Sequence, residues 1–373
     1  MLAIGLMSGT SLDGVDAALV NIEGKKVDLI NFATLRYDEE FKAKIFKSLN
    51  KDTARLDEIS TLNFELGHKF VEAIDLVLKG TKYKYEDIGF VASHGQTIWH
   101  DPNGATPSTL QIGEPSVISY KTNIITVSNF RTMDIAAGGE GAPLVPFSEH
   151  YLFANDKENL IMQNIGGISN LTFLPKGKGM DDLLSFDCGV GNIMIDFFTN
   201  KYFNKPFDED GKIALSGKVI DEVFAELIKD EFIYKKPPKS TGREQYSQTF
   251  MEELAEKLEF DKYKKEDIIA TITEFTVFGI VYNYKTFIKD FDTVVVNGGG
   301  SHNKYIIKRL KESFKEAKVL TGEEYGIDSD AKEAIAFAVL GYMTLNNRPS
   351  NVKSATGAKE AVILGNITVS PKD

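Results

Sequence analysis

One aspartate lies in a sequence context that suits acid–base chemistry beside a phosphate. Asp187 belongs to the segment Ser185–Asn192 (SFDCGVGN), directly after the apolar stretch 183–186, which predicts a buried strand. The two glycines allow close approach of another backbone, and a helix predicted from Ile193 would point its N-terminus at an anion. A carboxylate at this position could act as a general base. The same pattern is equally typical of an aspartate that caps a helix after a strand, so both interpretations stay open.

Two other glycine-rich segments could hold phosphate groups or a nucleotide. The segment Ser8–Gly14 (SGTSLDG) joins two predicted strands, and its small residues could present successive N–H groups to an anion. Asp13 and Asp16 would lie where a hydrated Mg²⁺ could bind, although a plain hairpin turn has the same composition. The segment 297–303 (NGGGSHN) follows the apolar strand TVVV, and its three glycines suggest a flat backbone surface for adenine or room for phosphates. A flexible loop is the alternative.

A third group of residues could bind a carbohydrate that carries an acidic substituent. The segment 94–100 (HGQTIWH) combines hydrogen-bonding side chains with the single tryptophan, and the segment 129–134 (NFRTMD) adds an arginine and a carboxylate. Hydrogen bonds, an aromatic face and an arginine fork together suit such a sugar. Trp99 could equally belong to the core. Glu333 could point into a cleft from its apolar helix or face solvent in the first helical turn.

Several familiar catalytic motifs are absent from the sequence. Gly217 and Lys218 are followed by valine, so the P-loop pattern fails, and GVGNIM lacks the last glycine of a dinucleotide-binding fingerprint. The sequence has no HExxH zinc pair and no GxSxG elbow. Any nucleotide chemistry must therefore use another fold. The basic, proline-rich segment 235–243 (KKPPKSTGR) predicts a loop that could cover a phosphate, and Cys188 is expected to be inert.

The composition limits the class of protein. The 373 residues include 43 Lys plus Arg and 54 Asp plus Glu, a formal net charge of −11, which argues against non-specific nucleic-acid binding. A single cysteine excludes an intrachain disulfide framework and fits a reducing compartment. No stretch of about 18 apolar residues and no basic leader is present, so we expect a cytoplasmic protein without a membrane span. At roughly 150 residues per domain, the length predicts two domains.

The order of the predicted elements suggests an internal duplication in an α/β chain. Strands are predicted in the first half at 2–7, 15–22, 27–37, 88–93 and 124–128. Strands are predicted in the second half at 159–165, 170–175, 183–186, 293–296 and 318–320. Helical periodicity covers 38–79, 250–258, 268–288 and 331–345. Glycine-rich turns are common in any α/β protein, but the matching order of elements favours duplication, with a boundary between residues 131 and 159.

Taken together, these segments resemble the superfamily of acetate and sugar kinases, heat-shock 70 proteins and actin. Within it, the sequence closely resembles the anhydro-N-acetylmuramic acid kinases over essentially the whole chain. The segments that carry this resemblance are GLMSGTSLDGVDAALV, SHGQTIWH, TLQIGEPSVIS, NFRTMDIAAGGEGAPLVP, NIGGISNL, FDCGVGN, DEDGKIALSG, PPKSTGRE and VVVNGGGSHN.

The resemblance implies a fold and a reaction. The expected fold is a two-domain, actin-like (ribonuclease H-like) ATPase fold with duplicated mixed-sheet domains around a central cleft. Residues 1–130 would form the first domain and 131–345 the second, with the segment 346–373 packed back on the first. The implied enzyme uses ATP and Mg²⁺, opens 1,6-anhydro-N-acetylmuramic acid with water and phosphorylates O6. The product would be N-acetylmuramic acid 6-phosphate, formed during recycling of cell-wall sugars, and the enzyme would be a homodimer.

The resemblance also implies roles for individual residues. Asp187 would be the general base that activates water, and Asp13 would bind Mg²⁺ through water. Thr97, Arg131 and Glu333 would contact the sugar, with Arg131 facing the lactyl carboxylate. The other residues expected at the sugar site are His94, Gln96 and Asp134. The residues expected at the ATP or phosphate site are Gly9, Thr10, Ser11, Leu12, Asp13, Gly14, Val15, Asp16, Gly166, Gly167, Gly189, Gly191, Asn192, Gly298, Gly299 and Gly300.

Three alternative functions remain at this point. The substrate could be another amino sugar or a small acid. The chain could also be a regulatory ATPase or nucleotide-binding module, although an intact Asp187 and the sugar-type segments favour an enzyme. A pure carbohydrate-binding protein is disfavoured by the three glycine-rich turns.

Overall fold

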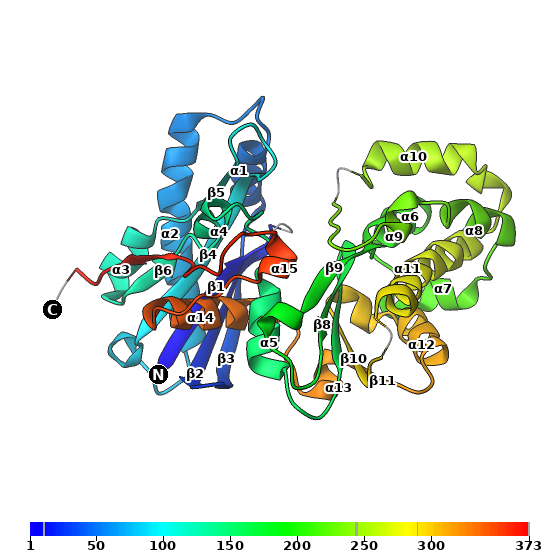
Figure 1. Cartoon of the computed structure of the whole chain (residues 1–373). Coiled ribbons are helices and arrows are strands. Elements are labelled where there is room, and N and C mark those ends of the chain that lie inside the picture. Colours follow the sequence, from blue (N-terminus) through cyan, green and yellow to red (C-terminus); the bar gives the residue numbers. More distant parts are fainter. Residues whose placement is uncertain (10–11, 243–244, 289, 372–373) are drawn as a thin grey trace. The chain divides into compact units, whose positions relative to one another are not determined.

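The computed structural model describes residues 1–9, 12–242, 245–288 and 290–371 (Figure 1). The chain divides into two compact units: unit 1 comprises Met1–Leu152 and Asp330–Asp373, and unit 2 comprises Phe153–Ser329. This division differs from the expected boundaries, because residues 131–152 and 330–345 belong to unit 1. The reason is packing: the helix that begins at Lys332 packs on the first sheet, against β1, β2 and β4. The predicted sites at Thr10 and Ser11 lie outside the described residues.

Unit 1 is a mixed sheet with helices on both faces. Its strands are β1 (Leu2–Ser8), β2 (Gly14–Glu23), β3 (Lys26–Arg36), β4 (Phe90–Asp101), β5 (Ser108–Ile112), β6 (Thr126–Ser128) and β12 (Asn366–Thr368). Its helices are α1 (Glu39–Leu49), α2 (Leu56–Leu78), α3 (Pro115–Thr122), α4 (Thr132–Ala136), α5 (Val145–Phe153), α14 (Lys332–Leu345) and α15 (Lys353–Thr356), with a short 3₁₀ turn η1 (Tyr85–Asp87).

Alternation along β1 decides which helix covers which face of the unit 1 sheet. Ile4 and Leu6 are fully buried in the same core cluster as the apolar face of α2. Gly5, between them, faces α14 so closely that an added Cβ would lie 1.8 Å from the backbone oxygen of Ala334. Because successive side chains in a strand point to opposite faces, α2 and α14 lie on opposite sides of the sheet.

The polar segment 94–100 forms a strand, not the loop after a strand that the sequence suggested. β4 runs on to Asp101 and pairs antiparallel with β5 through Gln96–Asp101, so the two strands form a hairpin. A register shift lies between Thr97 and Trp99. Thr, Ile and Trp favour strands, and β5 supplies the partner that the local pattern did not predict.

Unit 2 contains the second mixed sheet and the remaining helices. Its strands are β7 (Leu160–Ile165), β8 (Ile168–Leu174), β9 (Leu184–Val190), β10 (Thr293–Asn297) and β11 (Lys318–Thr321). Its helices are α6 (Ile193–Phe203), α7 (Lys212–Ser216), α8 (Asp221–Leu227), α9 (Glu231–Tyr234), α10 (Gln248–Lys257), α11 (Lys265–Phe287), α12 (Lys304–Ser313) and α13 (Gly322–Tyr325). Its 3₁₀ turns are η2 (Met180–Asp182), η3 (Glu209–Gly211), η4 (Phe260–Lys262) and η5 (Gly299–His302).

The two sheets share one topology, which confirms the predicted duplication. In unit 1 the strand order is β12-β6-β4-β1-β2-β3, and in unit 2 it is β11-β10-β7-β8-β9. In each, three consecutive strands form an antiparallel meander. A later strand, β4 or β10, pairs in parallel with the first strand of the meander, and β6 or β11 pairs in parallel with that strand. The fold is therefore the α/β, duplicated mixed-sheet fold expected from the sequence. The C-terminal segment adds β12, antiparallel to β6, to the unit 1 sheet.

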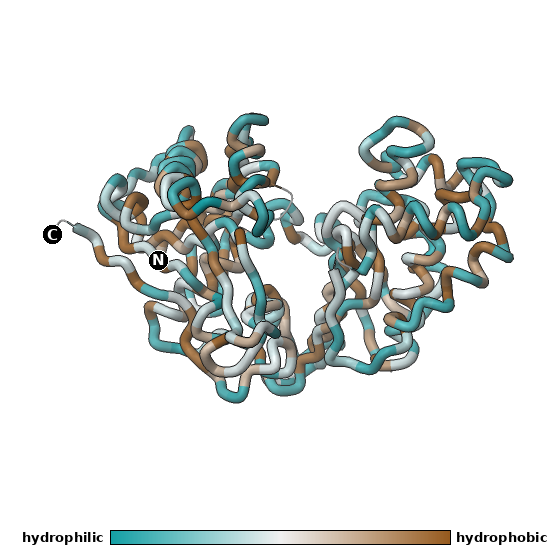
Figure 2. The backbone as a smooth tube through the Cα atoms, turned by 90° about the horizontal axis from the view of Figure 1, so that it is seen from above, coloured by the Kyte–Doolittle hydropathy of each residue, from teal (hydrophilic) through white to brown (hydrophobic). Residues whose placement is uncertain are grey.

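The hydropathy of the chain follows this architecture. Hydrophobic and hydrophilic residues alternate along the helices of both units, as expected for helices that cover a sheet with one face (Figure 2). Within the described residues, no helix is long and apolar enough to cross a membrane.

Candidate functional site

The glycine-bearing segments of unit 2 come together at one end of its sheet. The β7–β8 turn, Gly166–Gly167, accepts hydrogen bonds from the N–H groups of Gly191 (2.9 Å) and Asn192 (2.7 Å). The loop after β10 packs on the same turn, since a Cβ added to Gly300 would lie 2.3 Å from the side chain of Ile165. These approaches require glycine, and they join three predicted phosphate segments into one backbone-lined surface.

The other predicted glycines of unit 2 belong to the same surface or border it. Gly298 has a φ of 76°, and a Cβ there would lie 2.6 Å from Asn164 Oδ1. An added Cβ at Gly299 would lie 3.4 Å from Asn192 Nδ2. Gly189 lies within β9 itself, with a φ of 131°. The Gly299–His302 segment is a 3₁₀ turn and not an extended flat loop.

Asp187 occupies a position within β9, two strands away from β7 in the sheet. The strand continues to Val190 and α6 begins at Ile193, so Asp187 does not cap this helix and the capping alternative is wrong. Its carboxylate oxygen Oδ2 accepts a hydrogen bond from the backbone N–H of Thr241 (2.8 Å), and its own N–H donates to the carbonyl of Lys239 (3.1 Å). Its side chain is half-buried. The segment 239–241 therefore orients this carboxylate.

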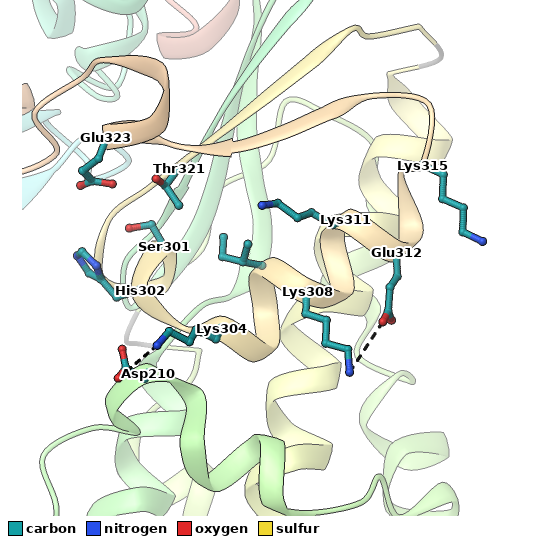
Figure 3. A pocket seen from close by; sticks show the side chains of 11 residues that line it. Asp210, Ser301, His302, Lys304, Lys308, Lys311, Glu312, Lys315, Thr321 and Glu323 are labelled. Atoms are coloured by element: carbon teal, nitrogen blue, oxygen red, sulfur yellow. Dashed lines mark ion pairs between the residues drawn. The ribbon is translucent and has the colours of Figure 1, made fainter.

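A second feature of unit 2 is a pocket of about 810 Å³ beside the glycine surface (Figure 3). Ser301 and His302 from η5, Lys304 from α12 and Asp210 from η3 line it, and the Lys304 ammonium lies 3.7 Å from the Asp210 carboxylate. Thr321 and Glu323 line its other side, and Lys315 points away from the His302 end (Figure 3).

The walls of this pocket are held together by close packing. η3 lies against the start of α12, because a Cβ added to Gly211 would lie 2.2 Å from Asn303 Oδ1. Asp208 holds η3 and α7 together by accepting hydrogen bonds from the N–H groups of Ile213 (2.8 Å) and Ala214 (3.0 Å). The sequence predicted a nucleotide-binding region here from the glycine segment 298–300. It did not predict that Asp210 and Lys304 line the pocket. Asp210 lies in the segment DEDGKIALSG, and the resemblance of this segment to a family motif could have indicated it.

In unit 1, the described residues of the β1–β2 turn are packed closely against the core and against β3. The side chains of Leu12 and Val15 are buried in the core, so only their backbone groups could take part in the predicted phosphate site. Leu12 has a φ of 59°, which is strained for a residue with a branched side chain and marks a tight turn. Gly14 lies so close to β3 that an added Cβ would be 2.2 Å from the Leu35 carbonyl oxygen, and Gly9 accepts from Leu12 N (3.3 Å).

Carboxylates gather beside this turn. Asp13 is exposed, and Asp16, on β2, accepts a hydrogen bond from Thr34 Oγ1 (2.6 Å). Desolvation raises the pKa of Asp16 above its ordinary value, and the neighbouring charges of Asp330 and Asp13 raise it further. Among the described residues, no group of three or more His, Cys, Asp and Glu side chains could hold a metal ion by itself. This donor set fits Mg²⁺ that keeps most of its waters and binds one or two carboxylates together with phosphates.

Arg131 is held in place by a buried histidine. Its Nε (3.1 Å) and a terminal nitrogen (2.9 Å) donate to His94 Nε2, and the other terminal nitrogen donates to the Gly141 carbonyl (2.9 Å). Burial, together with the Arg131 charge, lowers the pKa of His94 to about 3, so His94 is neutral and accepts these hydrogen bonds. Its ring packs on Phe337 of α14 with centroids 4.7 Å apart. His94 thus positions Arg131, and the sugar contact predicted for His94 stays a prediction.

A smaller pocket of about 300 Å³ lies in unit 1 and is lined by residues of β4, β5 and α2, His94 among them. Ser93, Gln111 and Asn129 are among the residues that line it, and the rim includes Leu56 and Leu110, both exposed. Ser93 Oγ and Gln111 Oε1 are buried without a hydrogen-bond partner. Unpartnered buried polar atoms at a pocket wall are suited to a polar ligand or bound water. The sequence predicted His94 as a site residue but not Gln111. Gln111 lies in the segment TLQIGEPS, whose resemblance to a family motif could have indicated it.

The remaining residues predicted for the sugar site divide into buried and accessible ones. Asp134 is fully buried and accepts from Gly141 N (2.7 Å), Asn351 Nδ2 (2.9 Å) and Thr356 Oγ1 (2.8 Å), which ties the glycine loop to the C-terminal segment. Its geometry favours a structural role. Gln96 is also buried and accepts from Ser8 Oγ (2.7 Å).

Thr97 and Glu333 are the accessible members of this set. Thr97 is partly exposed and accepts from Gln111 Nε2 (3.2 Å), which places it next to the smaller pocket. Glu333 is exposed in the first turn of α14 and lies within electrostatic range of Arg131 and Asp16. A buried ion pair joins the preceding residue, Lys332, to Glu149 (2.5 Å), which the sequence gave no reason to expect.

The repeated sheet topology and the converging glycine segments define a duplicated α/β protein with a glycine-lined surface in unit 2, and its relatives are kinases. The family model described as anhydro-N-acetylmuramic acid kinase matches residues 1–370. The chain is 48% identical to the anhydro-N-acetylmuramic acid kinase of Clostridioides difficile (strain 630) over 382 residues, with 100% of this chain and 99% of the relative covered. It is 46% identical to that of Bacillus thuringiensis subsp. konkukian over 383 residues, with both chains fully covered. The chain belongs to the anhydro-N-acetylmuramic acid kinase family.

Solved structures that match over most of the chain have much lower sequence identity and TM-scores below 0.5. The activator of the 2-hydroxyisocaproyl-CoA dehydratase from Clostridium difficile with bound ADPNP is 13% identical, with a TM-score of 0.47 and coverage of 91% of this chain and 93% of that chain. A ROK family glucokinase from Streptomyces griseus in complex with glucose and AMPPNP is 12% identical, with a TM-score of 0.41 and coverage of 91% and 99%.

Proposed function

We propose that this chain carries out the reaction of its family with Asp187 as the general base. The reaction would open 1,6-anhydro-N-acetylmuramic acid and phosphorylate O6 at the expense of ATP, in recycling of cell-wall sugars. The observation that carries the proposal is the position of Asp187 in the same sheet as the glycine surface of unit 2. Its half-buried carboxylate accepts one backbone hydrogen bond, from Thr241 N, and its main-chain N–H donates to Lys239 O. We also propose a cytoplasmic homodimer, on the basis of the family resemblance.

The proposed chemistry needs one proton acceptor. Water attacks the anomeric carbon, its proton passes to the Asp187 carboxylate, and the bond from that carbon to O6 breaks. O6 then bonds to the γ-phosphorus of ATP while the bond to the β-phosphate oxygen breaks, which releases ADP. Phosphoryl transfer otherwise depends on positioning and charge neutralisation, with no covalent protein intermediate.

The proposed position of the adenosine is in unit 2, and the proposed position of the metal ion is in unit 1. In unit 2, the pocket beside η5 would take the adenosine, since it offers the His302 ring and the Ser301 and Thr321 hydroxyls next to the glycine surface. In unit 1, Asp13 and Asp16 would hold hydrated Mg²⁺. When bound, Mg²⁺ neutralises phosphate charge during the transfer.

The sugar has a proposed position at the smaller pocket of unit 1. Arg131, fixed by His94 and Gly141, would pair with the lactyl carboxylate of the sugar. Thr97 and Gln111 border the pocket and would supply hydrogen bonds to the ring substituents. Glu333 would approach the same group of residues from α14.

A product analysis combined with one substitution tests the proposal. With ATP and the anhydro sugar, mass spectrometry should show a product heavier by one phosphate and one water, and a gain of phosphate alone would exclude ring opening. Asp187→Asn should reduce turnover by about 10²–10⁴-fold, the contribution typical of a general base, with nucleotide binding largely kept. Asp182→Asn, at an exposed aspartate of η2, is the control and should remain active. Turnover of Asp187→Asn at the wild-type rate would remove Asp187 from the mechanism.

The second candidate is a regulatory ATPase, which the nucleotide pocket alone would also fit. Release of ADP with no phosphorylated sugar, in the presence of the anhydro sugar, would favour that candidate.

A further inference from the structure

The side chain of Lys239, in the segment that contacts Asp187, makes an unusual set of contacts of its own. The Lys239 Nζ donates hydrogen bonds to the carbonyls of Phe232 (3.1 Å) and Ile233 (2.8 Å), both in the four-residue helix α9. The Phe232 carbonyl also accepts from Lys235 N (3.2 Å), so the ammonium is a second donor to that group. The Ile233 carbonyl lies at the helix end, where carbonyls lack the usual intrahelical partner. Lys239 thereby fastens the loop 235–241 to α9.

Three aromatic rings from three elements surround the same ammonium. The Nζ lies 4.9 Å from the ring centroid of Phe232 on α9, and 5.8 Å from those of Phe186 on β9 and Phe287 on α11. Cation–π attraction and the two carbonyls compensate for the partial burial of the charge. The position of Lys239 is therefore determined by β9, α9 and α11 together.

The backbone around Lys239 contacts Asp187 on both its main chain and its side chain. The carbonyl of Lys239 accepts from Asp187 N (3.1 Å), and two residues later Thr241 N donates to Asp187 Oδ2 (2.8 Å). The second contact is a hydrogen bond to a charged acceptor, which stabilises the ionised carboxylate and restricts its rotation. The geometry of the carboxylate thus depends on where the segment 239–241 is held.

We infer that Lys239 is a positioning residue for the general base: it anchors the segment 239–241 so that the Thr241 N–H keeps Asp187 oriented and ionised. The inference rests on the proposed function, because it assumes that Asp187 is the base. Lys239 itself contacts α9 carbonyls and aromatic rings, so it acts through Asp187.

The charges around Lys239 are compatible with this role. Burial lowers the pKa of Lys239 to about 8, while Cys188 and Asp187 on β9 and Asp230 before α9 raise it, and Lys235 after α9 lowers it. At pH 7 the side chain is therefore mainly protonated and keeps its hydrogen bonds. Phe287 on α11 contributes no charge.

Removing the ammonium tests the inference. Lys239→Met should lower kcat by roughly 10- to 100-fold, as expected when a catalytic group is displaced, with KM for ATP unchanged within about twofold. The acid limb of the kcat–pH profile should move to higher pH, because a carboxylate that loses an N–H donor binds its proton more tightly. Lys239→Arg should restore part of the rate and of the profile, since it retains charge and donors.

Lys235→Met is the matched control. Lys235 belongs to the same loop and lies 5.7 Å from the same Phe232 ring, but the described contacts give its ammonium no hydrogen bond to α9. It should leave kcat and the pH profile unchanged. If Lys239→Met does not fold, as judged by its melting curve, Lys239→Gln provides the same readouts while keeping one donor.

The outcomes separate this inference from the proposed function. Activity of Asp187→Asn at the wild-type rate would contradict the proposed function. An inactive Asp187→Asn together with a folded Lys239→Met of wild-type kcat and unshifted acid limb would overturn the inference alone. A reduced kcat without a shifted acid limb, not rescued by Lys239→Arg, would also overturn it, since that is the result expected of a purely structural lysine.

Discussion

At the scale of single residues, the structure separates the predicted site residues into partly accessible and buried side chains, which the sequence did not do. Asp187 and Arg131 were predicted as functional side chains, and both have an oriented, partly accessible geometry. His94 and Asp134 were predicted beside them, but both are buried and support other groups. Residue type and spacing indicate polarity at a strand end, whereas the direction of a side chain depends on contacts from α14 and the C-terminal segment, far away in sequence.

The buried His94 should make the stability of the chain depend on pH. Its pKa in the folded state is lowered to about 3, against an ordinary value of 6.5. As the pH falls below 6.5, the unfolded chain therefore binds a proton that the folded chain does not, and the free energy of unfolding decreases. Between pH 7.5 and pH 5 this histidine should account for a loss of about 2 kcal/mol.

Urea unfolding of wild type and His94→Gln at the two pH values measures this contribution. The variant should lose less stability on acidification than wild type by that amount, and its KM for the sugar should rise because Arg131 loses its support. His68→Gln, at an exposed histidine of α2, should behave as wild type. An identical pH dependence in wild type and His94→Gln would contradict the lowered pKa.

At the scale of elements, local pattern predicted strands and helices well where one face is buried continuously. The meander β1–β3 and the apolar helix α14 match their predicted ranges closely. β4 and β9 continue beyond their predicted ends, because the residues that follow pair with β5 and β8. A polar sequence contains no local signal for such a partner strand, so Asp187 was expected after a strand and lies within one.

The contact between α14 and β1 should be intolerant of any side chain at Gly5. A Cβ there would lie 1.8 Å from Ala334 O and 3.0 Å from Ala338 N, both of them helix backbone that cannot move independently. Gly5→Ala should therefore destabilise unit 1 by about 3 kcal/mol, at the upper end of overpacking effects. Thermal unfolding is the measurement. Gly179→Ala, where an added Cβ meets nothing within 4 Å, should change the melting temperature little, and equal melting temperatures for the two variants would contradict the packing described.

At the scale of the whole molecule, the two units differ in how the chain builds them. Unit 2 is one continuous segment, Phe153–Ser329, whereas unit 1 needs both Met1–Leu152 and Asp330–Asp373. The core cluster of unit 2 is formed entirely by residues between Ile161 and Val319. The sequence predicted the duplication but placed α14 in the second half, because nothing local shows that an apolar helix returns to the first sheet.

This arrangement predicts different behaviour for the two parts when each is expressed alone. The fragment 153–329 contains its complete sheet and core, so it should fold and unfold cooperatively. It also contains the glycine surface and the pocket beside η5, so ADP should raise its melting temperature, as any ligand that binds only the folded state does.

The fragment 1–152 should not fold by itself, because it lacks α14 and leaves one apolar face of β1, β2 and β4 uncovered. Joining it to 330–373 through a long Gly/Ser linker restores α14 and β12 and should restore a cooperative transition. Circular dichroism melts of the three fragments measure this difference. A cooperative transition in 1–152 alone would show that α14 is dispensable for that sheet. The absence of one in 153–329 would show that unit 2 depends on the rest of the chain for its fold.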